Sequence, residues 1–174
     1  MCATSSDGKS IRNATDVHQR LFLVVVDISE EMNVALRFAS QRAKNTGGRV
    51  ALLYVMEPAD FQHWMAVGEK MREERREEAE RTLKEFASQV KKITGEIPVL
   101  FFREGKAADE IVDLIKEEPN ICILVLGAAI GKKGPGPLVT SLVGKLSGKF
   151  PIPITVVPGN LTMEEVDVLT QNQT

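Results

Sequence analysis

Residues 21–31 of the chain read LFLVVVDISEE, a short apolar run that ends at a carboxylate and leads into a helical pattern. The run is rich in β-branched residues and contains no polar position, which is typical of a strand buried on both faces of a sheet. Apolar residues then recur at helical spacing, at Met32, Leu36, Ala39 and Ala43. We therefore predict a helix with Ser29 as its N-cap residue. Glu30 and Glu31 are favourable in its first turn because the N-terminus of a helix is positive, and Gly47-Gly48 is expected to terminate it.

Four more apolar runs follow, at residues 49–56, 97–102, 121–126 and 152–157. Helical periodicity fills the gaps between them, over about 61–93, 108–115 and 138–146. Strands that alternate with helices predict a parallel sheet with right-handed crossovers. The sequence therefore predicts one open α/β domain over residues 20–159, with five strands and with helices on both faces of the sheet. Prolines near the third and fifth runs favour edge positions for these two strands.

The composition excludes several classes of protein. The chain has 174 residues, of which 43% are hydrophobic, and a net charge of −2. These values do not fit a disordered chain, and they argue against a dedicated nucleic-acid binder. No run approaches the about 18 apolar residues of a membrane span, and residues 1–20 lack the apolar stretch of a signal peptide. With two cysteines, Cys2 and Cys122, we expect no disulfide framework and a cytoplasmic protein.

The two ends of the chain are polar. Residues 1–19 and residues 160–174 are predicted to be flexible tails, the second with room for a helical turn at 163–168. The sequence contains no internal repeat, and no low-complexity segment beyond these two ends.

Ligands of open α/β sheets bind beyond the carboxyl ends of the strands, where the strand order reverses. Asp27 ends the first run and Gly127 follows the fourth. The Asp27 carboxylate is suited to accept hydrogen bonds from a ribose or a base, and the alternative is a turn residue at a helix start. The His63-Trp64-Met65 segment follows the second run, either as a lid over the site or as ordinary packing at a helix start.

Residues 127–141 read GAAIGKKGPGPLVTS. Glycine lets a backbone approach a ligand closely, the lysine pair adds positive charge, and the final hydroxyls lie near the start of the next helix. The segment is either a phosphate cradle or a surface loop. It does not match the P-loop pattern, because Pro137 stands where that pattern needs lysine. Neither a dinucleotide fingerprint nor a zinc-binding pattern occurs in the chain, so we expect no metal site of the protein's own.

The order of these elements resembles the universal stress protein family over roughly residues 20–159. The segments that carry the resemblance are 23–39, 48–56, 104–111, 123–127 and 151–158. The resemblance implies a Rossmann-like sheet with strand order 3-2-1-4-5, which places the reversal between the first and fourth strands. It also implies a homodimer that pairs through the last strand, Ile152–Val157.

Many members of this family bind ATP through Gly-x2-Gly-x9-Gly-Ser/Thr after the fourth strand. Here Gly127 and Ser141 match, whereas Ile130 and Thr140 stand at the second and third glycines and Gly131 lies next to Ile130. By resemblance, Asp27 corresponds to the aspartate that contacts the nucleotide. The full set of residues expected at a nucleotide is Val26, Asp27, Val55, Met56, Gly127, Gly131, Thr140 and Ser141.

Three functions follow from the residues and the resemblance. The first is a stress-response regulatory protein that binds ATP, with Mg²⁺ accompanying it, and that hydrolyses ATP slowly at most, because Asp27 is the sole positioned base. The second is a homodimeric interaction module without nucleotide, acting through its charged long helix and its tails. The third is an enzyme of the wider adenine-nucleotide group, which is disfavoured because residues 27–30 replace the pyrophosphatase loop of that group.

Overall fold

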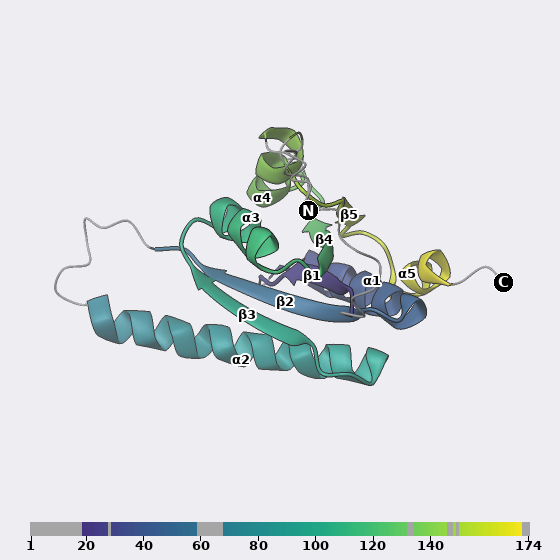
Figure 1. Ribbon diagram of the computed structural model, residues 1–174, viewed down its shortest axis with the longest axis horizontal. Helices are drawn as coiled ribbons and strands as arrows, with labels where there is room; N and C mark the ends of the chain where they lie inside the picture. Colours follow the sequence, from purple (N-terminus) through teal and green to yellow (C-terminus); the bar gives the residue numbers. More distant parts are fainter. Residues whose placement is uncertain are drawn as a thin grey trace, which may run out of the picture.

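The computed structural model describes residues 19–27, 29–58, 68–131, 134–145, 148 and 150–171. Five parallel strands form one sheet in the order β3-β2-β1-β4-β5 (Figure 1). The strands are β1 (Leu21–Val25), β2 (Arg49–Met56), β3 (Val99–Glu104), β4 (Ile121–Ala128) and β5 (Ile154–Pro158). This order confirms the predicted α/β class and the topology that the resemblance implied.

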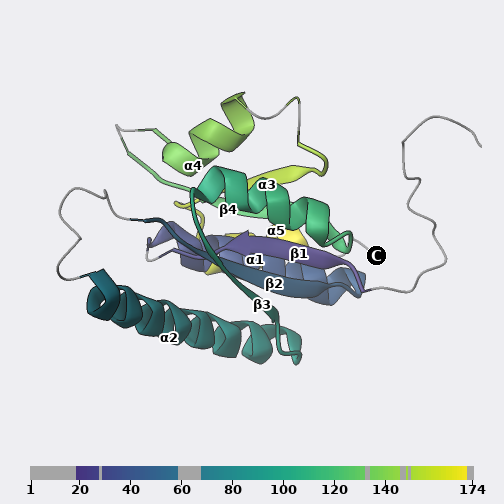
Figure 2. The same ribbon diagram turned by 60° about the vertical axis from the view of Figure 1, so that its left-hand side comes forward.

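Helices cover both faces of the sheet, as predicted (Figure 2). The helices are α1 (Glu31–Thr46), α2 (Gly68–Thr94), α3 (Ala107–Glu117), α4 (Pro137–Val139), which continues into a π-helical segment (Thr140–Lys145), and α5 (Met163–Thr170). The α1, α2 and α5 helices share one hydrophobic core with the sheet, and α3 and α4 share the other.

The side chains of β1 explain why its sequence has no polar position. Phe22 and Val24 belong to the core under α1 and α2, whereas Leu21 and Leu23 belong to the core under α3 and α4. Alternate residues of a strand point to opposite faces, so a strand with two covered faces needs an unbroken apolar run. The predicted end of α1 is also confirmed, because Gly47 adopts a left-handed φ of +67° there.

Two strands are displaced by two residues from their predicted starts. The third begins at Val99 instead of residue 97, and the fifth begins at Ile154 instead of residue 152. Proline explains the second shift, because Pro151 and Pro153 have no N–H to donate to a neighbouring strand. The carbonyl of Pro153 still accepts a 3.0 Å hydrogen bond from the Leu124 N–H, and β5 starts at the next residue. Both displaced strands lie at the sheet edges, as predicted.

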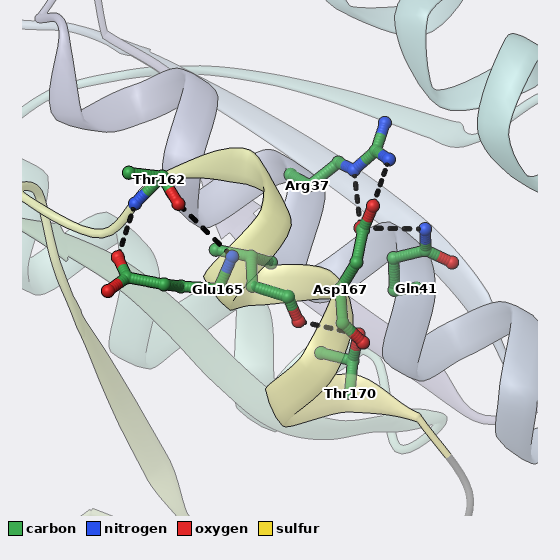
Figure 3. Close-up of polar contacts among 7 residues, drawn as sticks. Arg37, Gln41, Thr162, Glu165, Asp167 and Thr170 are labelled. Carbon is green, nitrogen blue, oxygen red and sulfur yellow. Dashed lines mark hydrogen bonds and ion pairs between the residues drawn. The ribbon is translucent and has the colours of Figure 1, made fainter.

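The C-terminal segment differs from the tail expected over residues 160–174, because residues 163–170 form α5. The Thr162 hydroxyl accepts a hydrogen bond from the Glu165 N–H, and the Glu165 carboxylate accepts one from the Thr162 N–H (Figure 3). This reciprocal capping box fixes the start of the helix. Val166 is then fully buried in the core that α1 covers. The predicted helical turn is therefore present, and it continues to Thr170 as a packed helix.

Polar contacts hold α5 against α1. The guanidinium of Arg37 donates two hydrogen bonds to the Asp167 carboxylate, at 2.8 and 2.6 Å, and the Gln41 amide donates a third at 3.1 Å (Figure 3). The hydrogen bonds from Arg37 lower the pKa of Asp167, and those same bonds raise the pKa of Arg37. The Asn45 amide also donates to the Thr170 carbonyl at 2.7 Å. These bonds orient α5 along the surface of α1.

Some predictions fall on residues that the structure does not describe. Residues 1–18 of the predicted N-terminal tail and the His63-Trp64-Met65 segment lie outside the described ranges. Among the helices that are described, none is both long enough and apolar enough to span a bilayer.

Candidate functional site

The strand order reverses between β1 and β4, so a crevice is expected beyond the carboxyl ends of these two strands. The chain leaves the sheet there through Val26, which is buried and donates its N–H to the Leu53 carbonyl at 2.7 Å. Asp27 follows and is exposed. Asp27, two residues after the end of β1, is therefore an exposed carboxylate at the carboxyl end of this strand.

The Asp27 carboxylate also shapes the turn into α1. Its Oδ1 atom accepts a 2.8 Å hydrogen bond from the Ser29 N–H, which is the geometry of an Asx turn. In the described part of the chain, Oδ2 of the same carboxylate has no hydrogen-bond partner. The two alternatives for Asp27 are thus compatible, because one oxygen serves the turn and the other remains available.

The prediction that Ser29 caps α1 is wrong. The N-cap residue is Glu30, and it makes no side-chain cap hydrogen bond. The reason is the Asx turn, which uses the Ser29 backbone and places this residue one position before the helix cap. The Ser29 hydroxyl instead lowers the pKa of the Glu31 carboxyl.

The end of β2 lies next to this edge. The register pairs Val25 with Leu53, so Val55 and Met56 extend past the last residue of β1. Val55 is half-buried, and Met56 is buried, with its carbonyl accepting the Gly105 N–H at 3.1 Å. Two apolar side chains thus lie at the same end of the sheet as Asp27.

Gly127 has a structural role that the sequence did not reveal. A Cβ atom at this position would lie 2.9 Å from the Glu31 carbonyl oxygen, closer than real Cβ contacts come. The first turn of α1 therefore packs directly on the backbone of β4. The same turn also contacts Gly159, where a Cβ atom would lie 2.2 Å from the Glu31 Cγ atom. Packing therefore requires glycine at 127 because of the Glu31 backbone, and at 159 because of the Glu31 side chain and the Ala128 carbonyl oxygen, which a Cβ atom would approach to 2.8 Å.

Glu31 is the residue of this site that sequence reasoning missed. Its own N–H, the Ser29 hydroxyl and the Ile130 N–H all donate hydrogen bonds that lower the pKa of the Glu31 carboxyl. The sequence signal was an acidic residue in the first turn of a helix, which is a common pattern without functional content. Spacing along the chain could not show that this carboxylate meets the loop after β4.

The loop after β4 holds the remaining predicted residues. Gly131 is exposed, and a Cβ atom there would meet nothing within 4 Å. Thr140 is exposed, but its hydroxyl donates to the Gly136 carbonyl at 2.8 Å and so serves its own helical turn. Ser141 is half-buried in the segment that follows. The structure thus gathers Val26, Asp27, Val55, Met56 and Gly127 at one edge of the sheet, and places Gly131, Thr140 and Ser141 along the adjoining loop and helix.

Among the described residues of the site, Asp27 and Glu31 carry charged side chains. Lys132 and Lys133, the predicted source of positive charge, lie outside the described residues. The described ranges contain no group of three or more His, Cys, Asp or Glu side chains that could hold a metal ion.

Comparison with known proteins identifies the family to which this fold belongs. The model of the universal stress protein family matches residues 20–158. A comparison with curated protein sequences found no match.

Solved structures share the fold at low sequence identity. Universal stress protein UspA from Lactobacillus plantarum is 20% identical, covering 82% of this chain and 99% of that chain with a TM-score of 0.65. A universal stress protein in complex with cAMP is 14% identical, with coverages of 82% and 98% and a TM-score of 0.57. The universal stress protein from Archaeoglobus fulgidus in complex with dAMP is 20% identical, with coverages of 80% and 98% and a TM-score of 0.54. Because the family model spans most of the chain, this protein belongs to the universal stress protein family.

Proposed function

We propose that this protein is a stress-response regulatory protein that binds an adenine nucleotide beyond the ends of β1 and β4. The observation that carries the proposal is the position of Asp27, exposed at the reversal of strand order, with one carboxylate oxygen that no described residue hydrogen-bonds. Two proteins with the same fold were solved with cAMP and with dAMP, which supports a nucleotide at such a sheet.

Each predicted residue has a role in the proposal. Asp27 accepts hydrogen bonds from the ribose hydroxyls, and Val26, Val55 and Met56 provide apolar contacts for the base. The backbone at Gly127 and Gly131 runs alongside the phosphates, and Thr140 and Ser141 lie near the phosphate that is farthest from the ribose. If ATP is the ligand, Mg²⁺ is held mainly by the phosphates and water, which is its usual mode of binding. We expect slow hydrolysis at most, because Asp27 is the only candidate base among these residues.

Calorimetric titration of nucleotide-stripped protein tests the proposal. ATP with magnesium, cAMP and adenosine are titrated separately. We expect at least one of them to bind with a micromolar dissociation constant, about −8 kcal/mol. Absence of binding by all three up to about 1 mM, weaker than about −4 kcal/mol, would overturn the proposal.

We also propose that the protein forms a homodimer through β5. This strand is at the sheet edge and pairs only with β4, so its outer backbone groups have no partner strand in the described structure. Edge strands are ready templates for pairing with another chain. Val156 adds an apolar side chain that is 36% exposed at this edge.

Replacement of Val156 by aspartate is expected to convert the dimer into a monomer, because it places two buried charges opposite each other across the paired strands. Sedimentation velocity measures the mass directly. Val168→Asp is the matched control, since this valine is 67% exposed on α5, away from the sheet edge. A wild-type protein that sediments as a monomer, or a Val156→Asp variant that remains dimeric, would rule out the β5 interface.

The second candidate function is an interaction module without nucleotide. The observation that favours it is the engagement of the Thr140 hydroxyl with the Gly136 carbonyl, at a position where the family's nucleotide-binding pattern has glycine. The N-terminal half of α2 offers a surface for this function. It is exposed and densely charged, and Arg72 pairs with Glu104 at 2.6 Å while the Arg76 guanidinium lies 5.5 Å from the centre of the Phe102 ring.

A further inference from the structure

The side chain of Glu31 lies between two backbone segments at the end of the sheet. On one side is Gly127 at the end of β4, and on the other is Gly159 in the turn after β5. Each approach is too close for a Cβ atom on the glycine. The backbone and the first side-chain carbons of Glu31 are therefore packed at this end of the sheet, and the residue is half-buried.

The carboxylate of Glu31 is directed to donors that an anionic ligand would also use. Its pKa is lowered by its own N–H and by the Ile130 N–H, which belongs to the loop between Gly127 and Gly131, and its Cβ atom lies against Gly127. Free N–H groups at a helix start and in a glycine-rich loop are the usual donors to a phosphate. Because these donors lower the pKa of Glu31, the carboxyl is ionised at neutral pH and presents a permanent negative charge.

We propose that Glu31 is a specificity-determining residue. Its negatively charged carboxylate repels ligands that carry several phosphate charges and so excludes them from this site. The proposal rests on the proposed function and narrows its ligand class. The site then takes adenosine or an adenine nucleotide with a single negative charge, such as a cyclic monophosphate, in preference to ATP. Ligands of the preferred class can use Asp27 without bringing a polyphosphate chain against the Glu31 carboxylate.

The expected discrimination follows from electrostatics. Charges a few ångströms apart near a protein surface change a binding constant by about tenfold or more, and a triphosphate carries several charges. We therefore expect the wild type to bind cAMP or adenosine at least about tenfold more tightly than ATP, measured at one ionic strength because salt screens the effect.

Glu31→Gln tests the proposal, because glutamine keeps the shape and an acceptor oxygen and removes the charge. The ratio of the ATP and cAMP dissociation constants is measured by calorimetry. We expect the variant to bind ATP about tenfold more tightly than the wild type, with adenosine affinity unchanged. Glu30→Gln is the matched control, since it removes the same charge from the neighbouring exposed residue and should leave the ratio unaltered.

Failure of this inference is distinct from failure of the proposed function. If adenine ligands bind but Glu31→Gln changes the ratio by less than twofold, or no more than Glu30→Gln does, Glu31 does not select the ligand. If neither the wild type nor either variant binds adenosine, cAMP or ATP, the proposed function itself fails. Thermal unfolding verifies that each variant is folded, and Glu31→Ala is the second variant, with the same expected gain in ATP affinity.

Discussion

Gly127→Ala is expected to lower the free energy of unfolding of the ligand-free protein by about 2 kcal/mol. The new Cβ atom would lie 2.9 Å from the Glu31 carbonyl oxygen and 3.1 Å from its carbonyl carbon. These are backbone atoms in the first turn of α1, so no rotation of a side chain can relieve the contact. The first turn of α1 has to move away from β4, so α1 would lose part of its packing against the sheet.

Urea unfolding monitored by circular dichroism measures this change. Gly131→Ala is the control, because a Cβ atom there meets nothing within 4 Å. That variant is expected to be unchanged, or stabilised by up to about 1 kcal/mol through the lower entropy of its unfolded chain. Equal stabilities for the two variants would show that the chain has glycine at 127 for a reason other than the packing of α1.

Asp27→Ala is expected to weaken the binding of adenine ligands by about 10- to 100-fold. A hydrogen bond to a charged group contributes about 1.5–3 kcal/mol, and each 1.4 kcal/mol changes the dissociation constant about tenfold. The alanine variant also loses the 2.8 Å hydrogen bond from the Ser29 N–H, so the turn into α1 is affected as well.

Asp27→Asn separates these two effects. Asparagine supports the same Asx turn, and it replaces the carboxylate oxygen that faces the ligand by a neutral group. We expect both variants to bind more weakly, with the melting temperature of the asparagine variant close to that of the wild type. Asp113→Ala, which removes an exposed carboxylate from α3, is the control and should bind normally. Unchanged affinity in Asp27→Ala would show that this carboxylate does not contact the ligand.

The fold could be predicted from the sequence because each strand carries its own signal. The run at residues 21–26 has to be buried on both faces, and the two core clusters on either side of β1 show why. The strand order came from the family resemblance, since periodicity alone does not say which strands are neighbours. Pro151 and Pro153 indicated an edge strand correctly, and the same prolines delay its start to Ile154.

The C-terminal helix was underestimated because its stabilising contacts are distant in sequence. Thr162 and Glu165 have the spacing of a capping box, and that local signal was available. The ion pair between Arg37 and Asp167 joins residues 130 positions apart, and no pattern along the chain announces it. A segment with one buried residue per turn, such as Val166 in α5, has too little periodicity to be distinguished from a tail.

The residues of the site that lie at strand ends could be predicted from the sequence. The contacts that depend on the conformation of loops and on the packing of α1 could not. Asp27 follows β1, and Val55 and Gly127 lie near the carboxyl ends of β2 and β4, the two neighbours of β1, so the topology alone brings the three residues to one end of the sheet. The approach of Glu31 to Gly127 and Gly159 depends on how α1 is seated, which the spacing of residues does not encode. The same holds for the Thr140 hydroxyl, whose bond to Gly136 is set by the local helical turn.

Amide NMR during titration with adenosine, cAMP and ATP shows directly whether an adenine ligand binds beyond the ends of β1 and β4. Binding at this site predicts that chemical shift changes concentrate at residues 26–27, 55–56 and 127–131, and that they saturate at a lower concentration of cAMP than of ATP. Shift changes confined to another surface, such as the groove on α5 lined by Leu161, Val168 and Leu169, would contradict it. So would a spectrum that none of the three ligands changes.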